Sequence, residues 1–117
     1  MRVASEIETR PIGGDAQEAP ASSEVWLFGR RGAQVSGAVL ETAVQTDAGT
    51  YLLFLTDDIP HEDFLSIHLL DAAGDLLDSA TIGSPYSTGA FSLLRMEPPN
   101  KVHFTFIGET NWMIEVL

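Results

Sequence analysis

Apolar and polar residues alternate along much of the chain, and short turn-forming segments interrupt the alternation about every 8–12 residues. Residues 101–107 show this best, since Val102, Phe104 and Phe106 all fall on one side of an extended strand. A period of two is typical of a strand with one buried face. Short strands without intervening helices predict an all-β, single-domain antiparallel β-sandwich or barrel of about seven to eight short strands, with at most one short helix.

Two segments refine this prediction. Residues 50–55 are apolar on both faces, which predicts a central strand that is covered on both sides. Residues 33–46 are compatible with a helix or a strand, but Gly37 and the β-branched residues favour a strand with a bulge near Leu40 and Glu41. A hairpin turn is expected at 29–32, and the other strands at 24–28, 64–70, 76–82, 90–96, 101–107 and 112–116, the last three as a meander.

The N-terminal part differs in composition from the rest. Residues 13–23 are small, polar and acidic, and predict a flexible acidic linker. Residues 1–12 alternate weakly, as an edge strand or a loose tail would, so 1–23 is separated from a compact β domain over 24–117. No apolar run is long enough for a signal peptide or a membrane span, and cysteine is absent. We therefore expect a cytoplasmic protein without disulfides or thiolate chemistry.

The net charge of the chain limits the kinds of binding partner to be expected. The 117 residues include 17 acidic and 6 basic side chains, for a net charge of −11. This balance argues against binding to nucleic acid or to an anionic membrane. From Gly32 to Leu94 there is no Lys or Arg, whereas the same stretch holds nine acids. Such a distribution serves solubility or forms a negative face for a basic protein.

Few residues offer catalytic chemistry. His61, His68 and His103 lack the spacing of a zinc site, and we expect all three to face solvent. The Gly83–Gly89 segment does not match the motif of a serine nucleophile. The sequence therefore predicts no catalytic residue, no metal ligand and no cofactor.

These observations favour a non-enzymatic acidic binding protein that engages a basic protein partner. Its most concrete form is a bacterial immunity protein or antitoxin, an inhibitor that covers the cationic active site of a nuclease-type toxin. The alternatives are a β-sandwich adaptor, assembly or carbohydrate-binding module, and a small His/carboxylate hydrolase. The predicted partner-binding residues are the carboxylates of one loop and the hairpin that follows it: Asp57, Asp58, Glu62, Asp63, Asp71, Asp75 and Asp78.

Overall fold

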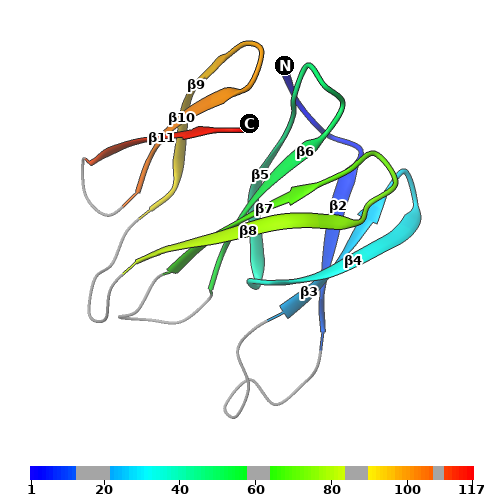
Figure 1. Cartoon of the computed structure of the whole chain (residues 1–117). Helices are drawn as coiled ribbons and strands as arrows, with labels where there is room; N and C mark the ends of the chain where they lie inside the picture. The colour runs from blue at the N-terminus through cyan, green and yellow to red at the C-terminus, as the bar shows by residue number, and fades with distance from the viewer. Residues whose placement is uncertain (13–21, 58–63, 84–89, 107–109) are drawn as a thin grey trace.

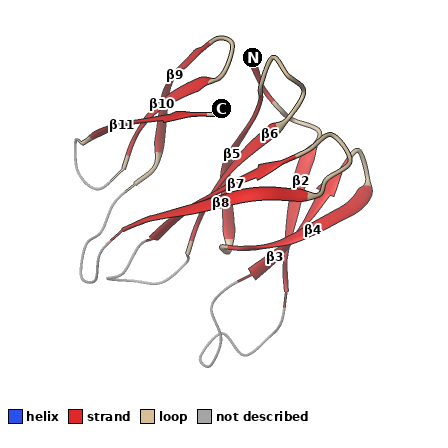
Figure 2. Ribbon diagram, in the orientation of Figure 1, coloured by secondary structure: helices blue, strands red, loops and turns tan. Residues whose placement is uncertain are grey.

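A computed structural model of the chain describes residues 1–12, 22–57, 64–83, 90–106 and 110–117. Over these residues the chain forms strands and turns but no helix (Figure 2). The described residues therefore include no helix that could span a membrane. The strands form three antiparallel sheets, which confirms the predicted all-β, sandwich-like fold class. The described residues contain eleven strands, more than the seven to eight expected. The additional strands come from the N-terminal twelve residues and from the division of 33–46.

The largest sheet has five strands in the order β1-β5-β6-β7-β8. All six residues of its middle strand, β6, are buried, so the prediction of a central strand covered on both faces is confirmed. The strands are β1 (Arg2–Val3), β5 (Val39–Gln45), β6 (Tyr51–Thr56), β7 (Phe64–Leu70) and β8 (Leu76–Gly83).

A three-stranded sheet, β2-β3-β4, covers one face of the five-stranded sheet. Val25, Leu27 and Val35 pack there in one core cluster with Leu53 and Leu55 of β6. Ala4 and Ile7 belong to the same cluster, so the N-terminal residues pack as strands and not as a tail. These three strands are β2 (Ile7–Ile12), β3 (Ser22–Leu27) and β4 (Arg30–Ser36).

A second three-stranded sheet, β11-β10-β9, covers the other face and forms the predicted meander. Its inward side chains Val102 and Phe104 join Leu52 and Phe54 of β6 in the second core cluster. Figure 1 shows this sheet on the left, the five-stranded sheet in the middle and the β2–β4 sheet on the right. Its strands are β9 (Ser92–Glu97), β10 (Lys101–Thr105) and β11 (Asn111–Glu115).

The segment predicted as one element over 33–46 is divided at Gly37 between β4 and β5. Gly37 has a φ of +117°, a conformation that side chains other than glycine rarely adopt. The predicted bulge is confirmed, because the pairing of β5 with β6 shifts register between Leu40 and Thr42. The predicted turn at 29–32 is shorter than expected, since β4 already begins at Arg30.

Candidate functional site: an exposed edge strand and its groove

β8 extends beyond both sheets that cover its neighbours. Its partner β7 is almost entirely buried, whereas seven of the eight residues of β8 are exposed and only Ile82 is half-buried. β8 also stands at the end of the strand order, so in the described part of the chain only one of its two backbone edges is paired. The five-stranded sheet therefore presents a long, accessible edge.

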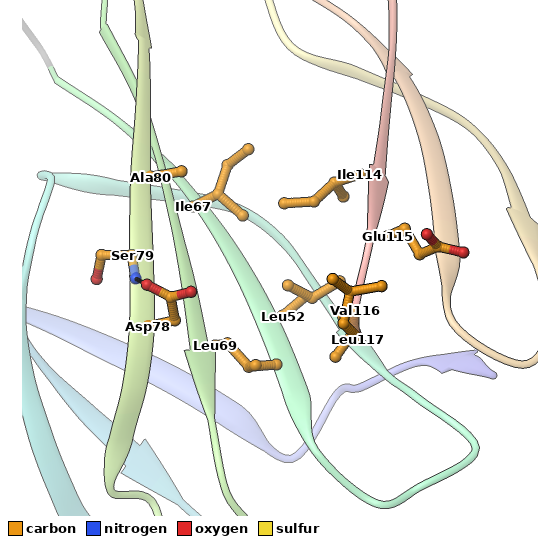
Figure 3. Close-up of a pocket in the computed structure, with 10 residues that line it drawn as sticks. All are labelled: Leu52, Ile67, Leu69, Asp78, Ser79, Ala80, Ile114, Glu115, Val116 and Leu117. Atoms are coloured by element: carbon orange, nitrogen blue, oxygen red, sulfur yellow. Dashed lines mark hydrogen bonds between the residues drawn. The ribbon is translucent and has the colours of Figure 1, made fainter.

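A groove of about 210 Å³ lies between β8 and β11, where the outer sheet ends (Figure 3). Directly opposite residues on paired strands project to the same face of a sheet, and Ala80 is opposite Ile67. The face of β8 that carries Ala80 therefore borders the same groove as Ile67 of β7. The lining of this β8–β11 groove is mostly aliphatic and comprises Leu52, Ile67, Leu69, Asp78, Ser79, Ala80, Ile114, Glu115, Val116 and Leu117.

Asp78 gives the groove its negative charge. Its carboxylate points from β8 toward the groove, and its Oδ1 accepts a hydrogen bond from the backbone N–H of Ser79 at 2.8 Å (Figure 3). The Glu115 carboxylate points away from the groove and lies 3.9 Å from Nζ of Lys101. The groove thus combines a mostly aliphatic floor with the Asp78 carboxylate at its β8 border.

Asp71 and Asp75 lie in the turn between β7 and β8, at the end of β8 nearer to Asp78. Oδ1 of Asp71 accepts hydrogen bonds from the backbone N–H groups of Ala73 and Asp75, both at 2.9 Å. Asp71 therefore holds the turn in shape through an Asx interaction. The carboxylates of Asp75 and Asp78 are exposed.

The other predicted contact residues belong to a different part of the molecule. Asp57 directly follows β6, at the end of the sheet opposite to the β7–β8 turn. The seven residues of β7 separate the two ends by about 20 Å. Asp58, Glu62 and Asp63 lie outside the described residues. The structure thus brings Asp71, Asp75 and Asp78 together but does not bring Asp57 to them.

The basic residues all lie outside strands β5 to β8, although Arg30 and Arg31 precede Gly32, which packs against Gly74 of the β7–β8 turn. Strands β5 to β8 contain no Lys or Arg. Several cations elsewhere have close partners: Arg2 forms an ion pair with Glu6, and the guanidinium of Arg10 lies 4.1 Å from the centre of the Trp26 ring. The basic residues are distributed over β1 (Arg2), β2 (Arg10), β4 (Arg30 and Arg31), β9 (Arg95) and β10 (Lys101).

His68 corrects the expectation of solvent-facing histidines. It is only 3% exposed, because the β2–β4 sheet covers its face of β7. Its Nε2 donates to the carbonyl oxygen of Ser36 at 2.9 Å, so the neutral ring accepts at Nδ1 from the Ser79 hydroxyl at 2.7 Å. His103 is half-buried, and His61 lies outside the described residues.

The contact between Ser79 and His68 has the distance of a nucleophile–base pair. However, the Ser79 side chain points away from the β8–β11 groove, to the opposite face of β8 (Figure 3). The contact therefore links β8, β7 and β4, and the side chains of Ser79 and His68 do not point into the groove. Among the described residues, no three His, Asp or Glu side chains are close enough together to hold a metal ion.

Burial lowers the pKa of His68 below its ordinary value of 6.5, although the hydrogen bond to Ser36 opposes the shift. As the pH falls through 6.5, the unfolded chain takes up a proton more readily than the folded one. The free energy of unfolding should therefore be fully maintained above pH 6.5 and decrease below it, by at most about 1.4 kcal/mol per pH unit. Urea unfolding of wild type and His68→Gln between pH 5.5 and 7.5 tests this, with a shallower dependence expected for the variant. Equal slopes would contradict it.

Comparisons of the chain with protein-family models, with characterised proteins and with solved structures find no match. Sequence reasoning selected Asp78 but not the aliphatic residues of the groove, such as Leu52 and Ile114. No local sequence signal marks them, because the groove exists only where β11 lies opposite β8.

Proposed function

We propose that this protein is a non-catalytic binding protein for a basic protein partner, and that the β7–β8 turn and β8 form its contact surface. The observation that carries the proposal is the segregation of charge. Strands β5 to β8 have no Lys or Arg, while the exposed residues Asp75, in the β7–β8 turn, and Asp78, on the edge strand β8, carry carboxylates. Charge of one sign on one surface accelerates encounter with an oppositely charged partner.

The most concrete form of this proposal is an inhibitor of a nuclease. The active site of such an enzyme is lined with cations that bind phosphates, and carboxylates of a binding protein can occupy those positions. In this form, the purified partner cleaves nucleic acid alone and loses that activity in the complex.

Affinity capture from a lysate of the source cells, with two charge variants, tests the proposal. Asp75→Asn combined with Asp78→Asn removes two charges from the proposed surface. Glu8→Gln combined with Glu24→Gln removes the same charge from the β2–β4 sheet. At about 50 mM salt, wild type and the second variant should retain one basic protein in near-stoichiometric amount. The first variant should retain less than half as much, and about 500 mM salt should weaken all three complexes through screening.

The rate at which the captured protein associates then distinguishes long-range electrostatic attraction from direct contact in the complex. Loss of the charges of Asp75 and Asp78 should slow association several-fold and reduce its dependence on salt, since exposed charges act chiefly on the association rate. Equal capture and equal association rates for the two double variants would contradict the proposal, because the location of the charge would then have no effect.

A further inference from the structure

We propose that an extended, lysine-bearing segment of the basic partner adds as a further strand to the free edge of β8, with a lysine side chain at the mouth of the β8–β11 groove. This inference rests on the proposed function and specifies how its partner binds. The juxtaposition that carries it is a long strand edge, unpaired among the described residues, beside a mostly aliphatic groove with the Asp78 carboxylate at its β8 border.

The backbone of β8 is suited to strand addition. With eight residues it is the longest strand described, and β7 pairs with only one of its edges. A free edge presents a row of N–H and C=O groups that an incoming extended chain can satisfy. Because both covering sheets leave β8 exposed, such a chain can approach from either face.

β8 lacks two features that protect other sheet edges from pairing, although its own pairing with β7 shifts register between Leu69 and Leu70. Proline and positively charged residues on an edge strand discourage the addition of another chain. The edge strand β2 contains Pro11, and the edge strand β4 begins with Arg30 and Arg31. β8 has neither proline nor lysine, and Asp78 is its only charged residue. Asp78 repels acidic segments and attracts basic ones, so the edge is selective.

The groove fits a long cationic side chain. Its volume of about 210 Å³ is below the roughly 300–1,000 Å³ of small-molecule sites, which suits one or two side chains of a partner. In a strand added beside β8, the side chain opposite Ala80 points over the same face as the groove. A lysine stem there can cross the small Ala80 toward Ile67, while its ammonium group meets the Asp78 carboxylate.

A second copy of this chain is a poorer occupant of the same edge. Pairing β8 with β8 would bring together two chains that each carry a net charge of −11, with Asp78 on both strands. Like charges on facing strands destabilise the pair. A basic segment removes this repulsion, so charge complementarity selects the partner over self-association.

Two synthetic heptapeptides of alternating lysine and valine test the mode of binding. One has an ordinary backbone, and its twin is N-methylated at two adjacent central amides, which blocks hydrogen bonding along both of its edges without changing its charge. Each is titrated into the ¹⁵N-labelled full chain at about 100 mM salt, and hydrogen exchange is measured on the complex. Matched variants are Asp78→Asn, which retains the Oδ1 acceptor, and Glu8→Gln on a distant strand.

Strand addition predicts that alternate amides of β8 exchange at least tenfold more slowly when the ordinary peptide binds. The N-methylated twin should bind at least tenfold more weakly, because it retains the charge but cannot pair. Asp78→Asn should weaken the ordinary peptide several-fold, while Glu8→Gln should leave its affinity within about twofold of wild type.

Three outcomes would overturn the inference. The first is equal binding of the two peptides without protection of β8 amides. The second is no binding of either peptide. The third is a dimer, detected by light scattering, whose β8 amides are protected without any peptide. None of them decides the proposed function, which succeeds or fails on the capture experiment and its charge variants.

Discussion

Replacing Gly37 with alanine is expected to lower the free energy of unfolding by about 2–6 kcal/mol. A side chain at its φ of +117° is strained, at a cost of about 1–3 kcal/mol. The added Cβ would also lie 2.5 Å from Cβ of Leu55, a fully buried residue on the central strand. This overpacking costs about a further 1–3 kcal/mol. Urea unfolding followed by tryptophan fluorescence measures the change.

Gly49→Ala is the matched control. Gly49 also has a positive φ, +89°, but a Cβ added there would have nothing within 4 Å. The control variant should therefore show only the backbone cost of about 1–3 kcal/mol. If both glycine variants were equally destabilised, the close approach of Gly37 to Leu55 would not contribute to stability, and a different cause would separate β4 from β5 at Gly37.

Phe54→Ala is expected to destabilise the protein by about 3–5 kcal/mol, the usual range for deletion of a buried aromatic ring. Phe54 is 0% exposed, and its ring centre lies 5.0 Å from that of Phe91 and 5.3 Å from that of Phe104. These rings join the five-stranded sheet to the β9–β11 sheet. Removing one leaves a cavity at that junction, so amides of β9 to β11 should also exchange faster.

Phe28→Ala controls for the loss of a phenylalanine as such. Phe28 is 70% exposed at the turn before β4, and its truncation should change stability by less than about 0.5 kcal/mol. Denaturation of both variants by urea gives the comparison. A similar effect at the two positions would mean that the ring cluster around Phe54 does not hold the β9–β11 sheet in place.

The burial of the central strand and the exposure of β8 have one origin. The two covering sheets are narrower than the five-stranded sheet, with three strands each. They bury both faces of β6 but leave β8 uncovered. A rigid sheet with one accessible edge suits strand addition, because the edge is ordered before the partner arrives and little backbone entropy is lost on the protein side.

Much of the local structure follows from the sequence, for local physical reasons. Alternation places Val102, Phe104 and Phe106 on one face because successive side chains of a strand point to opposite sides. Continuous apolarity over 51–55 indicates a strand buried on both faces. The bulge after Leu40 agrees with the break in the apolar pattern at that point.

Sequence alone thus determined the strand class, most strand positions and the separation of acidic from basic residues, because these depend on neighbouring positions along the chain. Tertiary structure decided which faces are covered and which strands lie at an edge. His68 is polar by pattern yet buried, because β4 packs over it and satisfies Nε2 through the carbonyl of Ser36. Asp57 and Asp78, both predicted from the sequence as contact residues, lie in different regions because β7 runs between the two ends of the sheet. The groove itself arises because β8 and β11 border the same space, and no local pattern encodes that placement.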